Sequence, residues 1–95
     1  MKGAWYVYIV ECSEGTLYTG ITNNIDKRIR DHNAGIGSRY TKGRRPVKLL
    51  GKWDCADKSH AAKMEYKIKR LSRSDKLRAI MGMVKSKGEG ELDQR

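Results

Sequence analysis

The stretch that decides the fold is GAWYVYIVECSEGTLYTGITN, residues 3–23. Two segments, 3–12 and 16–23, are rich in Tyr, Val, Ile, Thr and Trp, which favour β-strands, and a short glycine-containing segment separates them. The stretch therefore predicts a β-hairpin. A three-residue loop fixes which residues lie opposite one another: Cys12 and Thr16, Val10 and Tyr18, Tyr8 and Gly20.

The two faces of this hairpin differ in polarity. The odd-numbered face is the more uniformly apolar and is expected to pack on helices: Trp5, Val7, Ile9, Leu17, Thr19 and Ile21. The even-numbered face carries Tyr6, Tyr8 and Tyr18, which should converge. We expect that tyrosine face to be half-exposed.

The following segments predict a helix, a loop and a third strand. Asn23 or Asn24 can cap a helix that begins near Ile25 and stops at Gly35. Its apolar stripe is Ile25, Ile29, His32 and Ile36. Residues 35–46, GIGSRYTKGRRP, are predicted to form a long loop, and residues 47–53 are predicted to form the strand.

Two more helices complete the predicted domain. Ser59 can cap one that runs to about Arg73, and Ser74 with Asp75 can begin another from Lys76 to about Lys85. The order β-β-α-β-α-α predicts an α/β (α+β) fold, a small and largely antiparallel three-stranded sheet flanked by helices. Residues 1–87 are expected to form a single domain, and the polar residues 88–95 a disordered tail.

The charge of the chain indicates its partner. The 95 residues carry a formal net charge of +10, which favours nucleic acid, although such charge can also serve solubility alone. No stretch approaches the about 18 apolar residues that span a bilayer, so no membrane partner is expected. With two cysteines and no signal-peptide pattern, we expect a cytoplasmic protein. The thiols and imidazoles lack the close spacing of a zinc site.

Two sequence features could contact phosphate or metal. The segment SRYTKGRRP combines flexible glycine with Tyr40 and four cations, and we expect it to contact phosphates through Arg39, Lys42, Arg44 and Arg45. Glu65 lies at the edge of the apolar stripe of the second helix. It could form an ion pair with Lys69, or it could face inward and hold a divalent cation such as Mg²⁺. Taken singly, Arg28, His32 and the tyrosines have ordinary surface or packing roles.

Together these residues resemble a known family. Tyr6-Val7-Tyr8 and Tyr18-Thr19-Gly20 are similar to the paired tripeptides that name the GIY-YIG nuclease superfamily, with Tyr6 in place of the first glycine and Thr19 in place of the central isoleucine. Arg28 matches the essential arginine of the family, and Glu65 matches its metal-binding glutamate. His32 and Tyr40 stand where members often carry His or Tyr. The likeness runs from about residue 4 to 77 and is closest to small stand-alone bacterial members of unassigned role.

The resemblance implies a Mg²⁺- or Mn²⁺-dependent DNA endonuclease, with DNA preferred to RNA. Because no separate module for reading base sequence fits in 95 residues, we expect it to act on damaged, branched or nicked DNA. The implied catalytic residues are Tyr8, Tyr18, Arg28, His32 and Tyr40. Glu65 would bind the metal, and Lys69 would join the basic loop in binding nucleic acid. Either Tyr8 or Tyr18 would activate the attacking water. Two alternatives stay open: a non-catalytic nucleic-acid-binding module, and a protein that only interacts with other proteins.

Overall fold

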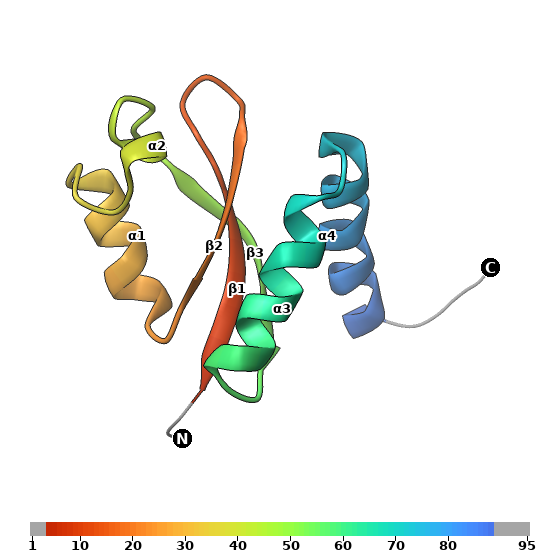
Figure 1. The fold of residues 1–95 in the computed structure, drawn as a ribbon. Coiled ribbons are helices and arrows are strands. Elements are labelled where there is room, and N and C mark those ends of the chain that lie inside the picture. Colours follow the sequence, from red (N-terminus) through yellow and green to blue (C-terminus); the bar gives the residue numbers. More distant parts are fainter. Residues whose placement is uncertain (1–3, 89–95) are drawn as a thin grey trace.

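A computed structural model describes residues 4–88 of the chain, with the elements shown in Figure 1. In chain order they are β1 (Trp5–Glu11), β2 (Leu17–Thr22), α1 (Ile25–Asn33), α2 (Arg39–Lys42), β3 (Lys48–Cys55), α3 (Lys58–Lys69) and α4 (Arg73–Gly88). The strands form one antiparallel sheet in the order β2-β1-β3. This is the predicted α+β fold with one short helix, α2, added.

The hairpin has the register that its loop length predicts. Tyr8 lies opposite Gly20 and Val10 opposite Tyr18. The Cys12 amide donates to the carbonyl of Thr16 at 2.8 Å and closes the loop. Gly15 adopts φ +94°, a left-handed conformation that glycine accepts without steric cost. The even-numbered side chains of both strands therefore share one face.

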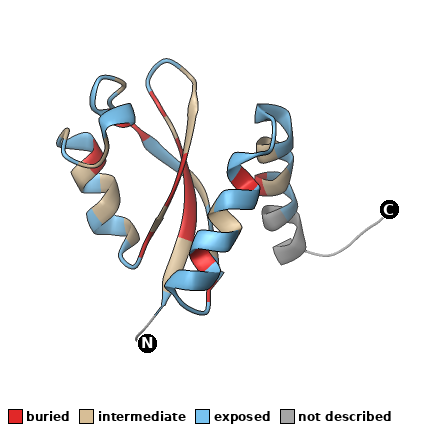
Figure 2. Cartoon of the chain, viewed as in Figure 1, coloured by how far each residue is buried: buried red, intermediate tan, exposed pale blue. Residues whose placement is uncertain are grey.

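The odd-numbered face packs on helices, as its apolar character predicts. Its core comprises Val7, Ile9, Cys55, Ala61, Ile68 and Ile80, from β1, β3, α3 and α4. Figure 1 shows α3 beside the sheet with α4 outside it, and Figure 2 shows the buried residues concentrated along β1. Burial of this face holds α3, and with it Glu65, against the sheet.

The tyrosine face is more deeply buried than predicted. Tyr8 is completely buried in a second cluster that includes Val10 and Val47, and Ile25 and Ile29 of α1 pack against it. The expected half-exposed face was wrong for Tyr8 because α1 and α2 lie over it (Figure 1). Tyr8 and Tyr18 do converge, with ring centroids 6.4 Å apart. The ring of Tyr6 instead lies 4.8 Å from the ammonium of Lys52.

The predicted loop at residues 35–46 contains a helix. Ser38 caps α2 by accepting a hydrogen bond from the Thr41 amide at 3.1 Å. This helix is too short to show an apolar period in the sequence, so the glycines and cations around it led to the prediction of a loop. Asn24 caps α1 as predicted, but α1 ends at Asn33 and leaves Ile36 73% exposed, outside the expected stripe.

The ends of α3 and α4 also differ from the predictions. Asp57, not Ser59, caps α3 by accepting from the His60 amide at 2.8 Å. The helix stops at Lys69, so Leu71 lies beyond it and is exposed. Ser72 accepts from the Asp75 amide at 3.1 Å, and α4 therefore begins three residues before the predicted start. It runs to Gly88, and the rest of the predicted tail, 89–95, lies outside the described residues.

Candidate active site

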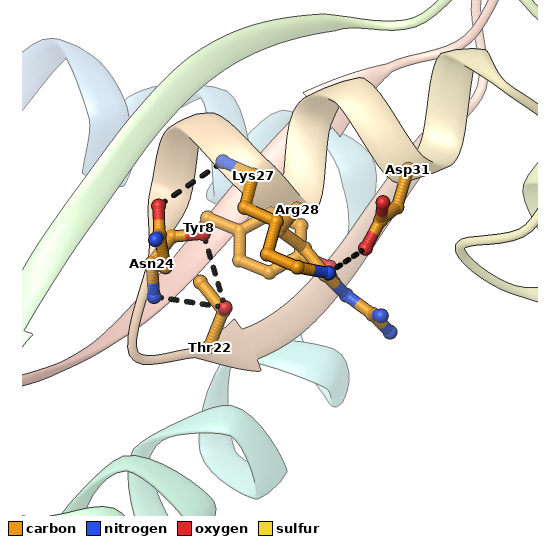
Figure 3. A network of polar contacts seen from close by, with 6 residues as sticks. All are labelled: Tyr8, Thr22, Asn24, Lys27, Arg28 and Asp31. Carbon is orange, nitrogen blue, oxygen red and sulfur yellow. Dashed lines mark hydrogen bonds and ion pairs between the residues drawn. The ribbon is translucent and has the colours of Figure 1, made fainter.

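Three of the predicted site residues meet at the hydroxyl group of Tyr8. Its oxygen lies 2.7 Å from Nε2 of His32 and accepts a hydrogen bond from Nε of Arg28 at 3.3 Å. Arg28 and His32 are four residues apart on α1, so both project from one side of the helix toward β1. Figure 3 shows Arg28 reaching Tyr8, while Lys27 pairs with Asp31 on the same helix.

Gly20 makes room for this arrangement. It lies opposite Tyr8 in the sheet, and a Cβ atom at residue 20 would stand 2.6 Å from the Tyr8 hydroxyl oxygen and 2.8 Å from Cζ. Real Cβ atoms essentially never come that close to another heavy atom. Tyr8 is completely buried and cannot swing away. The last residue of the second tripeptide is therefore fixed as glycine by packing against the tyrosine ring.

A second layer of hydroxyl groups, missed by the sequence reasoning, supports His32. Nδ1 of His32 lies 2.7 Å from Oγ1 of Thr41, which is 3.0 Å from Oγ of Ser38. His32 and Thr41 are both completely buried. The signal that could have found them is the spacing of Ser38 and Thr41, three residues apart, which is that of a helix cap. The cap of α2 thus holds the imidazole against Tyr8.

Burial sets the protonation of this cluster. The pKa of Tyr8 is raised, chiefly because burial disfavours the phenolate, and the bond and charge of Arg28 only partly oppose this. The pKa of His32 is lowered by burial and by the positive charge of Arg28. Burial lowers the pKa of Arg28 as well, but its hydrogen bond and charge interaction with Tyr8 leave that pKa above its ordinary value. At neutral pH the cluster therefore holds a neutral phenol, a neutral imidazole and a cation.

The other two aromatic residues of the predicted site form a stack beside this cluster. The ring of Tyr18 lies 5.4 Å from that of His32 and stacks on Tyr40 with centroids 5.7 Å apart. The guanidinium carbon of Arg44 stands 4.0 Å from the Tyr40 centroid and closes the stack. The structure thus brings together all five predicted catalytic residues.

The cations of the basic loop divide into two kinds. Arg44 donates to Glu14 at 2.9 Å and to the Tyr40 carbonyl at 2.7 Å. Arg45 donates to the carbonyl groups of Lys42 and Asn33 at 2.8 and 3.4 Å. By contrast, the exposed side chains of Arg39 and Lys42 have no ion pair or hydrogen bond within residues 4–88. Arg44 and Arg45 organise the loop, whereas Arg39 and Lys42 project from it.

Glu65 approaches the site from α3. Its Oε2 lies 3.4 Å from Nζ of Lys69, the ion pair that their spacing predicts, and its negative charge contributes to the raised pKa of Tyr8. Within residues 4–88 no three His, Cys, Asp or Glu residues cluster around a common metal position. Mg²⁺ is commonly held by one or two carboxylates, with water and substrate phosphate at its other positions. The single, partly exposed carboxylate of Glu65 is consistent with an open Mg²⁺ site of this type, in which water and phosphate complete the coordination, and not with a site closed by protein ligands alone.

Two further expectations concern the rest of the molecule. Cys12 and Cys55 are both buried free thiols, in separate hydrophobic clusters. Burial raises the pKa of each thiol, which disfavours the reactive thiolate. None of the helices within residues 4–88 is long and apolar enough to cross a membrane.

Comparison with known proteins finds relatives along most of the chain. The family described as the GIY-YIG catalytic domain matches residues 4–78. The UPF0213 protein DP2720 of Desulfotalea psychrophila is 57% identical over 76 residues, which are 79% of this chain and 69% of that protein. The UPF0213 protein SH2523 of Staphylococcus haemolyticus is 52% identical over 75 residues, 79% of this chain and 92% of its own length. The function of the UPF0213 proteins is unassigned.

Two solved structures have the same fold. The solution NMR structure of the UPF0213 protein BH0048 from Bacillus halodurans aligns with a TM-score of 0.53 at 42% identity, over 82% of this chain and 83% of that one. The NMR structure of the protein EF2693 from E. faecalis aligns with a TM-score of 0.59 over 96% of both chains. At 24% identity, this second likeness supports the fold alone.

Proposed function

This chain belongs to the GIY-YIG family, and on that premise we propose that it is a divalent-metal-dependent endonuclease that hydrolyses DNA phosphodiesters. The observation that carries the proposal is the contact of the Tyr8 hydroxyl with both His32 and Arg28. Two side chains that could exchange a proton thus lie beside a fixed positive charge, next to a loop rich in exposed cations, and this supports the proposal. Proton transfer from the attacking water and stabilisation of the charge that develops on the phosphate would both accelerate hydrolysis of a phosphodiester.

Arg28 is the residue suited to contact the scissile phosphate. Its Nε is occupied by Tyr8, whereas its terminal nitrogens have no hydrogen-bond partner within residues 4–88. A guanidinium can donate two parallel hydrogen bonds to phosphate oxygens. Because the Tyr8 contact holds one side of the group in place, Arg28 would meet the charge that develops on the phosphate with little reorganisation.

Tyr8 and His32 are suited to remove the proton from the attacking water. With Arg28 donating to the Tyr8 oxygen, the tyrosine proton is directed to Nε2 of the neutral His32. Because Tyr8 is completely buried in the free protein, this step requires the bound substrate and its water to open a path to the Tyr8 oxygen. As the water oxygen then bonds to phosphorus, its proton passes to Tyr8, the proton of Tyr8 passes to His32, and the bond to the leaving oxygen breaks. Neither ring needs to hold a charge before the substrate arrives. Tyr18 is more exposed and is the second candidate for contact with the water.

Glu65 is the residue that would hold Mg²⁺ or Mn²⁺. A bound divalent ion would polarise the scissile phosphate and stabilise the leaving oxygen. Lys69 neutralises Glu65 in the free protein and is close enough to turn to a phosphate oxygen when Glu65 takes another partner. Arg39 and Lys42 would position the flanking backbone, because phosphate contacts fix register without reading sequence.

The first test is cleavage of nicked, flap and branched DNA in the presence of Mg²⁺ or Mn²⁺. Wild type is compared with Glu65→Gln and with Asp54→Asn, purified in parallel to exclude a contaminating nuclease. Asp54 is a matched control because its carboxylate is also paired with a lysine, Lys52, but its side chain is 80% exposed on β3. We expect cutting by wild type and Asp54→Asn, and loss of cutting in Glu65→Gln with DNA binding retained.

Substitution of the two tyrosines separates their roles. Tyr8→Phe keeps the ring but removes the hydroxyl that contacts both His32 and Arg28, so cleavage should fall by about 100-fold or more, as on removal of a general base. Tyr18→Phe should have a smaller effect, because its stacking on Tyr40 is retained. Tight DNA binding without cutting by any of these proteins, wild type included, would favour the non-catalytic binding module.

A further inference from the structure

A second feature on α3 combines an exposed aromatic ring with positive charge. Tyr66 is 63% exposed, whereas tyrosine is a residue of intermediate burial in folded proteins. The guanidinium of Arg70 lies 5.5 Å from the Tyr66 ring centroid, and its Nη1 donates to the Tyr66 hydroxyl at 3.3 Å. The ring is thus held in place by a cation and is not packed into the core.

Several basic residues lie around this ring on the outer face of α3. Ala61 and Ile68 are buried toward the sheet, which places Tyr66 on the opposite side of the helix. Exposed cations lie three or four residues from it along the helix: Lys63, Lys69 and Arg70. Glu65 is the one acidic residue of Lys58–Lys69. This face therefore attracts a polyanion and repels basic partners.

We propose that Tyr66 and Arg70 bind an unpaired nucleotide of single-stranded nucleic acid, with a base stacked on the Tyr66 ring and Arg70 and Lys63 against the adjoining phosphates. This inference rests on the proposed nuclease function for the nature of the substrate. Exposed aromatic rings set among cations are how proteins hold single strands, since every base offers a flat face. In an intact duplex those faces are covered by neighbouring base pairs, so the ring selects unpaired nucleotides.

The position of the ring joins this surface to the candidate active site. Tyr66 follows Glu65 directly, and one residue turns an α-helix by about 100°. Lys69 projects between the two directions and is 3.4 Å from Glu65. A strand cleaved beside Glu65 can therefore pass over Lys69 and continue onto Tyr66. The arrangement favours substrates with a single-stranded segment next to the scissile bond, such as flaps.

Binding of fluorescent oligonucleotides in EDTA tests this proposal without requiring cleavage. Three probes are used: a single strand, a flap and a blunt duplex of the same length. We expect Tyr66→Ala to weaken binding of the single strand and the flap by about fivefold or more, and to leave duplex binding unchanged. Tyr66→Phe keeps the ring and should bind like wild type. Met81→Ala is the matched control, because Met81 is 61% exposed on α4 and should have no effect.

The outcomes separate this proposal from the nuclease proposal. Unchanged single-strand binding in Tyr66→Ala, or an equal loss for all three probes, would overturn the Tyr66 site even if Glu65-dependent cutting is found. Selective loss in Tyr66→Ala would support the site even if wild type cuts no substrate. Arg70→Ala is the second variant if Tyr66→Ala has a lower Tm, and it should weaken single-strand binding and lower its salt slope by about 0.7. A normal slope and affinity in Arg70→Ala would count against the site.

Discussion

The hydroxyl oxygen of Tyr8 lies 2.7 Å from Nε2 of His32, and both side chains are completely buried. Because Arg28 donates to the same oxygen, the hydroxyl proton is directed to Nε2 of His32, and the single N–H proton of the neutral imidazole is then on Nδ1, facing Thr41. The chain of contacts fixes the tautomer of His32. The Tyr8–His32 pair therefore responds as one unit to any change in the residues around it.

The stability of the protein should fall in mild acid because His32 is buried neutral. Its pKa in the folded state is below the value of about 6.5 expected in the unfolded state. The contribution of His32 to the free energy of unfolding is therefore fully present above that pH and is lost as the pH falls below it. A pKa that is lower by one in the folded state than in the unfolded state contributes about 1.4 kcal/mol to the free energy of unfolding. Urea unfolding at several pH values should show a shallower dependence in His32→Gln. The same pH dependence in His32→Gln as in wild type would contradict the prediction.

Substitution of Gly20 by alanine should damage the candidate site through packing alone. The added Cβ would stand 2.6 Å from the Tyr8 hydroxyl, so the strand or the tyrosine must shift. We expect a loss of about 1–3 kcal/mol in the free energy of unfolding, as for other overpacked cores, together with reduced cleavage. Gly43→Ala is the control because no atom lies within 4 Å of its added Cβ. Equal free energies of unfolding for the two variants in urea would contradict the prediction and show that β2 can shift to accommodate the added Cβ atom.

Thr41 should matter through its hydroxyl group. Thr41→Val keeps the shape of the side chain but leaves Nδ1 of His32 without a partner in the core, which should cost about 1–3 kcal/mol of stability. Thr41→Ser retains the hydroxyl and should recover much of that loss. If the Tyr8–His32 pair transfers a proton, the pH profile of kcat should also shift in Thr41→Val and return toward wild type in Thr41→Ser. Identical profiles in the two variants would leave Thr41 with a packing role only.

The sequence predicts some features of this site and not others. The hairpin register followed from the loop between Cys12 and Thr16, because a period of two leaves few alternatives for strands that bury one face. The contact of His32 with Thr41 could not be predicted in this way. It depends on α2, a four-residue helix that is too short to show an apolar period in the sequence. Gly37 is part of that contact, since a Cβ there would lie 2.4 Å from Nδ1 of His32.

The burial of Tyr8 was missed for the same reason. Alternation along β1 correctly ranked the two faces by polarity, but it carries no information about what covers the less apolar one. The cover comes from α1 and α2, and α2 was predicted to be loop. Family resemblance assigned Arg28, His32 and Glu65 to a site, whereas only the structure shows that Arg28 and His32 share one hydroxyl group.

Within the basic loop, substitution should separate cations that bind DNA from cations that hold the loop together. Arg39 and Lys42 have exposed, unpaired side chains within residues 4–88, so Arg39→Ala and Lys42→Ala should each weaken DNA binding and lower its salt slope by about 0.9 without changing Tm. Arg45→Ala should also lower Tm, because it removes hydrogen bonds to the carbonyl groups of Lys42 and Asn33. Fluorescence anisotropy across a salt series measures the slopes.

Arg78→Ala provides the control for loss of charge alone. Arg78 is 73% exposed on α4, where it pairs with Asp75, and its removal subtracts one positive charge without touching the loop. If the loop cations contact phosphates, Arg78→Ala keeps the wild-type slope while Arg39→Ala and Lys42→Ala do not. Should all three variants weaken binding to the same extent, the net charge of the protein would be attracting DNA, and the loop would have no specific contact with the backbone.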